Sequence, residues 1–186
     1  MKRRNFFGLG GEPARRAARR AEQWLRPPFV EDETQFLLAC TRCDKCIEAC
    51  PHEVLFRLPA RYGTQVADTP ALDLRNGGCH LCADWPCVAA CESEALRLPE
   101  GPAPSPKLAR VAVDTESCLA YLGPECGACA HVCPIPGALI WEAGLRPLID
   151  PDRCTGCALC REACIVEPKA ITVVAYHRER ATQEAS

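Results

Sequence analysis

Residues 40 to 51 read Cys40-Thr-Arg-Cys43-Asp-Lys-Cys46-Ile-Glu-Ala-Cys50-Pro51, which is a C-x2-C-x2-C-x3-C-P run. This spacing is typical of the loop that holds a 4Fe-4S cluster in bacterial ferredoxins, because three closely spaced thiolates can wrap one face of a cluster while backbone amides turn toward the sulfurs. In two-cluster ferredoxins the fourth cysteine ligates the neighbouring cluster, so such motifs occur in pairs. The run therefore predicts one cluster site and a partner motif elsewhere in the chain.

Three more groups of four cysteines follow, and the four groups together use all sixteen cysteines of the chain. The second group has two additional residues before its third cysteine, and the third group has seven residues between its first and second cysteines. We predict that the chain binds four 4Fe-4S clusters. The predicted cofactor-binding and metal-binding residues are Cys40, Cys43, Cys46, Cys50, Cys79, Cys82, Cys87, Cys91, Cys118, Cys126, Cys129, Cys133, Cys154, Cys157, Cys160 and Cys164.

Other uses of cysteine fit this pattern less well. Structural zinc also uses C-x2-C, but it closes its site with two remote pairs rather than with three cysteines in one short run. Disulfide scaffolds are typical of small secreted chains, and no cleavable signal is visible here. The sequence has no P-loop, dinucleotide fingerprint or GxSxG elbow. It therefore favours an electron carrier or accessory subunit over an enzyme with substrate chemistry of its own.

The segments between the motifs indicate an α+β fold with two bacterial-ferredoxin-like modules, each of order βαββαβ and centred on its clusters. A short helix is expected before Cys40, and strands are expected over residues 54–58, 94–98, 107–114 and 170–174, with a hairpin over 138–149. Aromatic residues make up only 6% of the chain. The core must therefore form largely around the clusters, and the chain without clusters is predicted to be largely unfolded.

The modules predict five regions: a basic N-terminal helical arm (1–30), a module with the first and second motifs (31–98), a Pro-rich linker or hairpin loop (99–106), a module with the third and fourth motifs (107–176), and a flexible tail (177–186). Sequential pairing of the motifs, first with second and third with fourth, makes the Pro-rich span a linker. Nested pairing, second with third inside first with fourth, makes it a hairpin loop. The 20 residues between Cys133 and Cys154 slightly favour sequential pairing.

The arm differs from the rest of the chain in charge. Residues 1–30 contain eight Lys and Arg residues against two Glu, for a formal charge of +6, whereas the whole chain has a net charge of −2. A basic arm on an acidic body favours docking of the arm to a partner subunit or an acidic surface, with a solvated helix as the alternative. No nucleic-acid partner is expected.

The start of the arm also bears on location. Lys2-Arg3-Arg4-Asn5-Phe6-Phe7 is similar to the core of a twin-arginine export signal. Charged residues follow it where a signal needs an apolar stretch of about 7 to 15 residues. We therefore expect a cytoplasmic protein, with periplasmic export through Arg3-Arg4 as the alternative. No apolar run in the sequence is long enough to span a membrane.

With these residues in view, the chain resembles the ferredoxin-type proteins of the NapF, NapG and MauM kind, which are found with periplasmic nitrate reductase and similar bacterial systems. The resemblance is carried by Arg3-Arg4, Arg26-Pro27-Pro28, Phe36-Leu37-x-x-Cys40-Thr-Arg-Cys43-Asp, Cys118-Leu-Ala-Tyr121 and Cys154-x-Gly156-Cys157. Two segments match the NapG side instead, Cys82-Ala-Asp-Trp-Pro-Cys87 and Cys164-Ile-Val-Glu-Pro-Lys-Ala-Ile171. The resemblance implies a cytoplasmic polyferredoxin, closest to NapF, with four 4Fe-4S clusters.

Three functional hypotheses follow. The first is a protein that relays single electrons through its clusters to or from a redox partner protein or oxidoreductase complex. The second, which the resemblance implies, is a cytoplasmic accessory or maturation protein that binds a metalloenzyme such as periplasmic nitrate reductase before export and reduces or protects its metal centre. A molybdoenzyme is therefore one candidate partner. The third is a permanent subunit of a larger oxidoreductase.

Overall fold

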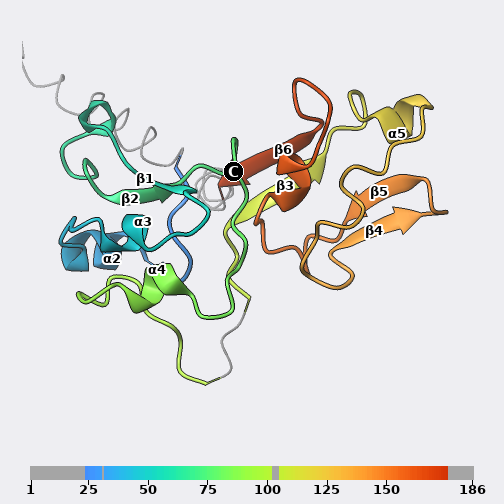
Figure 1. Cartoon of the computed structure of the whole chain (residues 1–186). Coiled ribbons are helices and arrows are strands. Elements are labelled where there is room, and N and C mark those ends of the chain that lie inside the picture. The colour runs from blue at the N-terminus through green and yellow to red at the C-terminus, as the bar shows by residue number, and fades with distance from the viewer. Residues whose placement is uncertain (1–23, 31, 102–104, 176–186) are drawn as a thin grey trace, which may run out of the picture.

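The computed structural model describes residues 24–30, 32–101 and 105–175. The Arg3-Arg4 start, most of the predicted arm and all of the predicted tail lie outside these ranges. We call residues 24–101 the first lobe and residues 105–175 the second lobe, within the described ranges, because Figure 1 shows them side by side as two bodies. No helix in the described ranges combines the length and apolar composition needed to cross a membrane.

Within the described ranges the two lobes contain three antiparallel sheets of two strands each, connected by short helices and loops. In the first lobe the elements are α2 (Glu33–Ala39), α3 (Lys45–Glu48), β1 (Leu55–Arg57), the 3-10 helix η1 (Ala60–Tyr62), β2 (Pro70–Leu72) and α4 (Pro86–Ala89). In the second lobe they are β3 (Ala109–Val113), α5 (Leu119–Leu122), β4 (Leu139–Glu142), β5 (Arg146–Ile149), α6 (Leu159–Glu162) and β6 (Ile171–Ala175). The sheets pair β1 with β2, β3 with β6, and β4 with β5.

The second lobe has the element order βαββαβ. The strands predicted over 107–114 and 170–174 are confirmed as β3 and β6, which pair from Ala109 opposite Ala175 to Val113 opposite Ile171. The hairpin predicted over 138–149 is confirmed as β4 and β5. Its turn has positive φ at Ala143 and Gly144, the backbone region that tight hairpin turns require.

The first lobe departs from the predicted βαββαβ order. Its described residues form one pair of strands, β1 with β2, and lack the pair of outer strands that β3 and β6 form in the second lobe. The strand predicted over residues 94–98 is wrong: these residues form bends and irregular backbone. Glu94 has φ of 56°, which interrupts an extended chain. The Leu96 N–H donates to the Cys91 sulfur at 3.3 Å instead of to a neighbouring strand. The Leu96 side chain is buried, so its apolar character reflects core packing.

The helix predicted before Cys40 is confirmed as α2. The Asp32 carboxylate caps it by accepting from the Gln35 N–H at 2.8 Å, which satisfies one of the free amides of the first turn. The Cys40 N–H donates to the Phe36 carbonyl at 2.8 Å, and Cys40 itself is extended, so the helix ends there. Phe36 is buried in the main core, and α2 therefore holds the first cysteine motif against that core.

The main hydrophobic core runs through both lobes. It contains Phe36, Leu74 and Leu96 from the first lobe together with Leu108 and Ala175 from the second. Cysteines form a substantial part of this core, namely Cys46, Cys79, Cys87 and Cys157. A smaller core under the β3–β6 sheet includes Cys129. The thiols thus occupy positions that aliphatic side chains fill in most small proteins.

Arg26 is a buried charge at the edge of the first lobe, with 7% of its surface exposed. Its guanidinium donates to both carboxylate oxygens of Glu33, at 3.1 and 2.9 Å from Nε. Nη1 donates to the Thr69 hydroxyl at 2.9 Å and to the Pro70 carbonyl at 2.8 Å. Arg26 thereby ties the chain before α2 to the start of β2.

Replacing this arginine tests how much the tie contributes. Arg26→Met is expected to destabilise the protein by about 2 kcal/mol, because it leaves the Glu33 carboxylate and the Pro70 carbonyl without their donor. For a chain of this size that corresponds to a fall in melting temperature of about 4 to 8 °C. Arg61→Met is the matched control, since Arg61 is exposed and contacts the neighbouring Tyr62, with its guanidinium 4.9 Å from the ring centroid and 3.4 Å from the hydroxyl. Equal falls in the two variants would contradict the assignment.

Candidate iron-sulfur sites

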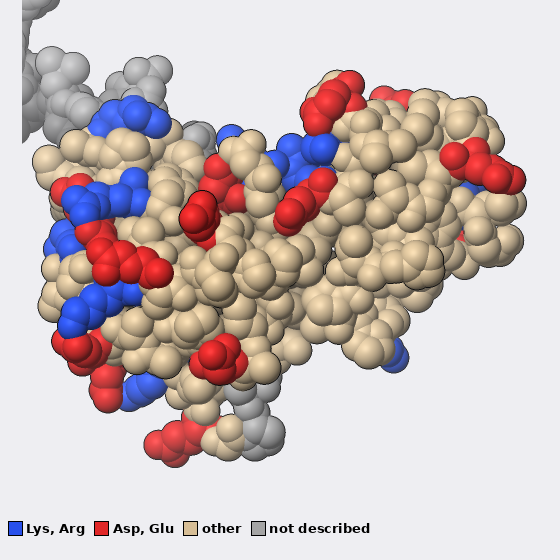
Figure 2. Space-filling view, in the orientation of Figure 1, with Lys and Arg blue, Asp and Glu red and all other residues tan. Residues whose placement is uncertain are grey.

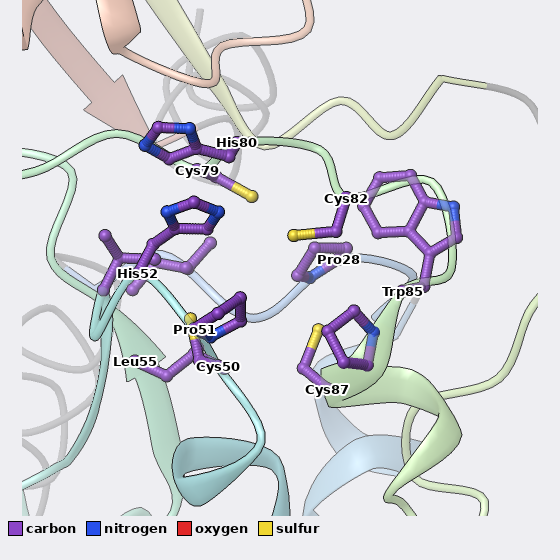
Figure 3. A pocket seen from close by; sticks show the side chains of 13 residues that line it. Pro28, Cys50, Pro51, His52, Leu55, Cys79, His80, Cys82, Trp85 and Cys87 are labelled. Atoms are coloured by element: carbon purple, nitrogen blue, oxygen red, sulfur yellow. The ribbon is translucent and has the colours of Figure 1, made fainter.

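Four cysteines line one pocket in the first lobe. Cys79, Cys82 and Cys87 come from the second motif and Cys50 is the last cysteine of the first motif. Figure 3 shows their sulfurs turned toward a shared space, which measures about 350 Å³ including the part open to solvent. Apolar and aromatic side chains complete the wall, among them Pro28, Leu55 and Trp85. The wall supplies four thiols in a mostly apolar setting.

A second pocket repeats this arrangement in the second lobe. Cys154, Cys157 and Cys160 come from the fourth motif, and Cys133 is the last cysteine of the third motif. The space that they surround measures about 320 Å³, again including the part open to solvent. Apart from Thr155, its other lining residues are again apolar, including Val111 and Ile149. Three thiols from one motif and one from its partner therefore surround each pocket.

The remaining eight thiols form two further groups of the same composition. Burial is the largest cause of the raised pKa of the Cys46 thiol, and the nearby charges of Cys91, Cys40 and Cys43 raise this pKa further. Burial likewise raises the pKa of the Cys129 thiol most, and the nearby charges of Cys118, Cys126 and Cys164 raise it further. Each group again contains the first three cysteines of one motif and the last cysteine of another. The structure brings the first motif together with the second and the third with the fourth, as sequential pairing predicts.

Burial sets the chemistry of these thiols. It raises the pKa of Cys87 and of Cys160 to about 12, and that of Cys46, Cys79 and Cys129 to about 11. A buried thiolate is unfavourable unless a positive charge lies beside it. Iron ions supply such charge, and soft thiolate ligands are the ligands that iron-sulfur clusters use.

The backbone of the loops is shaped to face the sulfurs. Residues between the cysteines have positive φ, as at Arg42 (59°), Asp44 (63°), Leu81 (50°) and Ala158 (65°). Alternating left-handed and right-handed residues turn successive N–H groups to one side, which makes an anion-binding concavity. The Lys45 N–H lowers the pKa of the exposed Cys43 thiol, and the Gly156 N–H donates to the Cys154 sulfur at 3.4 Å. The amides predicted to point at sulfur do so.

The thiols line pockets rather than meet at one point. In the described ranges, no three His, Cys, Asp or Glu side chains come close enough to hold a single metal ion together. A 4Fe-4S cluster spreads its four thiolate ligands over a cube of iron and sulfide, so its cysteines surround a volume. The donor set, the apolar walls and the raised pKa values fit this group.

The structure also adds residues that the motif pattern did not identify. His52 and His80 stack at the rim of the first-lobe pocket, with ring centroids 3.5 Å apart and an angle of 6° between the rings. Lys107 donates through Nζ to the carbonyls of Asp152 and Cys154, at 2.6 and 2.9 Å, and so fixes the entry to the fourth motif. His80 lies next to Cys79 in sequence, whereas nothing in the sequence relates Lys107 to residues more than forty positions away.

Comparison with known proteins places this geometry in context. Residues 145–164, which contain the fourth motif, match the family model described as a 4Fe-4S binding domain. The chain is 36% identical over 163 residues to the ferredoxin-type protein NapG of Haemophilus influenzae, across 81% of this chain and 58% of NapG. It therefore spans little more than half of that relative.

Two shorter relatives are matched over more of their length. The chain is 38% identical over 159 residues to the methylamine utilization ferredoxin-type protein MauM of Methylobacillus flagellatus, across 81% of this chain and 68% of MauM. It is 33% identical over 168 residues to the ferredoxin-type protein NapF of Escherichia coli, across 86% of this chain and 90% of NapF. These matches include both lobes.

Proposed function

Because the chain belongs to the family of ferredoxin-type iron-sulfur proteins that includes NapG, NapF and MauM, we propose that it holds four 4Fe-4S clusters and relays single electrons between partner proteins. The observation that carries the proposal is the fourfold repetition of one arrangement, three thiols of one motif with the last thiol of its partner. A bound cluster takes up or gives up one electron at a potential set by its surroundings.

The proposed ligand sets define four sites, numbered by the motif that gives three ligands. The first site comprises Cys40, Cys43, Cys46 and Cys91; the second Cys79, Cys82, Cys87 and Cys50; the third Cys118, Cys126, Cys129 and Cys164; and the fourth Cys154, Cys157, Cys160 and Cys133. We further propose that residues 31–98 and 107–176 are two modules that each hold one pair of sites. Within each module the shared ligands join two loops into one unit.

The chain's own groups have separate tasks in this proposal. The thiolates bind iron, and the loop amides donate to sulfur and so raise the reduction potential. Apolar wall residues such as Trp85, Leu55 and Val111 keep water from the clusters. None of these tasks requires a substrate pocket or a general base, in keeping with an electron carrier.

The surface supports docking of a partner at the end of the second lobe. Figure 2 shows charged side chains gathered over the first lobe, whereas the face of the second lobe in view is mostly uncharged. The exposed apolar residues Leu122, Ile140, Leu145 and Leu148 lie in or beside the β4–β5 hairpin and α5, and α5 begins directly after Cys118 of the third site. Such a surface suits apolar contact with another protein. We propose an oxidoreductase as that partner, while the basic arm as a docking element remains a prediction.

Anaerobic reconstitution with iron and sulfide tests the proposal. The full chain is expected to take up about sixteen iron and sixteen sulfide ions and to be reduced reversibly by dithionite. Cys126→Ser is expected to lose about a quarter of the iron, because it removes one ligand of the third site alone. His131→Asn is the matched control, since His131 is exposed in the same loop and is not a proposed ligand. Zinc in place of iron, or a full iron content in Cys126→Ser, would count against the proposal.

A further inference from the structure

The two lobes meet where the second motif touches the fourth. The Cys79 N–H donates to the Cys157 carbonyl at 2.8 Å. Both cysteines are buried in the shared core, with 8% and 7% of their surfaces exposed. Cys79 lines the pocket of the second site and Cys157 lines that of the fourth. One backbone hydrogen bond therefore connects a proposed ligand of one lobe to a proposed ligand of the other.

Helix α6 holds this contact in place. The Glu162 carboxylate accepts from the Gly78 N–H at 2.7 Å. The Arg161 guanidinium donates from Nε to the Arg75 carbonyl at 3.3 Å, and from Nη1 to the Ile171 carbonyl in β6. Two neighbouring side chains of α6 therefore form hydrogen bonds with the segment that leads into Cys79.

The segment lies so close to α6 that an added side chain would be crowded. A Cβ atom at Gly78 would lie 2.6 Å from Leu159 Cδ2 and 3.0 Å from Leu159 Cα. To admit this atom, the Leu159 side chain must move and the backbone of α6 must shift slightly away from Gly78. At Gly77, by contrast, an added Cβ would meet only the Val54 side chain, at 3.0 Å and within the first lobe. Close approach at Gly78 is therefore specific to the lobe junction.

The other two sites lie away from the junction. Figure 1 shows α2, which leads into the first motif, on the outer side of the first lobe, and α5, which begins at the third motif, at the far end of the second lobe. The first and second motifs exchange their last cysteines, so the first site is connected to the junction through the second site. The third site is connected to it through the fourth site in the same way.

We propose that the four sites form a single row in the order first, second, fourth, third, and that the Cys79–Cys157 contact is the crossing between the two pairs. This inference rests on the proposed function. Each step along the row moves one electron, so that the group at one site is oxidised while the group at the next is reduced, with no bond formed or broken and no proton moved. The first and third sites are then the ends at which donor and acceptor dock.

The order is tested by magnetic coupling between reduced clusters in the reconstituted full chain. With dithionite as reductant, neighbouring paramagnetic clusters broaden each other's EPR signals. Cys154→Ser, which empties the fourth site, is expected to leave one isolated, unbroadened third site beside a coupled pair. Cys126→Ser, which empties the third, is expected to leave three coupled clusters and no isolated one. The reverse pattern, or an isolated cluster in both variants, would overturn the row.

A second variant keeps the test decisive if the serine variants fail to fold. Gly78→Ala is expected to retain full iron and sulfide but to weaken the broadening between the two pairs, because the junction must open to admit the added methyl group. Gly77→Ala should retain both iron and broadening. Unchanged broadening in Gly78→Ala would refute the crossing. An iron content far below four clusters in the unmodified chain would instead refute the proposed function, so the two failures are distinguishable.

Discussion

Chelation of iron from the reconstituted protein is expected to abolish its cooperative thermal unfolding and most of its helix and strand content. Five buried cysteines lie in the hydrophobic cores, and the helices within the motifs, such as α3 and α4, have only four residues each. Helices this short and isolated two-stranded sheets are not stable alone. The loss should therefore approach the whole stability of the fold, about 5 to 15 kcal/mol.

Circular dichroism and calorimetry under anaerobic conditions measure this loss, and restoring iron and sulfide is the control for reversibility. Iron loss should also quicken as pH falls from about 9 to 6. Burial holds the pKa of thiols such as Cys87 well above the ordinary value, so these sulfurs take up protons readily once iron leaves, and protons compete with iron. A chelated chain that still melts cooperatively at the original temperature would show that the cores do not depend on the clusters.

Gly156→Ala is expected to destabilise the second lobe by about 3 kcal/mol or more and to reduce the iron content by about a quarter. Gly156 has φ of +78°, and a Cβ there would lie 2.0 Å from the Ala109 carbonyl oxygen and 2.3 Å from the Ala109 nitrogen. The clash is with the backbone of β3, so the fourth motif would have to move away from that strand. The Gly156 N–H would then lose its contact with the Cys154 sulfur.

Gly144→Ala is the matched control for this change. Gly144 has a similar φ of +72°, but an added Cβ would meet nothing within 4 Å. It should therefore cost only the backbone strain of about 1 to 2 kcal/mol and leave the iron content unchanged. If both variants lost stability and iron equally, backbone strain rather than the close approach to β3 would be the cause.

The cysteine spacing predicted more of the molecule than any other feature. It identified the thiols that line the pockets, and strand signals identified β3, β6 and the β4–β5 hairpin. These elements depend on local patterns, namely alternating apolar residues and a turn with Ala143-Gly144. The predicted strand at 94–98 is wrong because the apolar side chain of Leu96 packs in the main core without being part of a sheet. Its N–H donates to the Cys91 sulfur rather than to a neighbouring strand.

The lobe junction had no comparable signal in the sequence. It depends on a backbone bond between Cys79 and Cys157 and on the space left by the missing Cβ at Gly78. Neither leaves a periodic pattern, and the two segments are separated by almost eighty residues. The role of Arg26 was equally hidden, because an Arg-Pro-Pro sequence gives no indication that its charge is buried against Glu33 and Thr69.

The exchange of the last cysteine between paired motifs has a consequence for biosynthesis. The first site requires Cys91 and the third requires Cys164 under the proposed ligand sets, so neither can close on its own loop while the ribosome is still making the partner loop. The first pair becomes complete only once Cys91 has been made, and the second only once Cys164 has been made. Cofactor insertion should therefore occur in two stages, one for each lobe, and a nascent chain halted between Cys91 and Cys118 should carry two clusters.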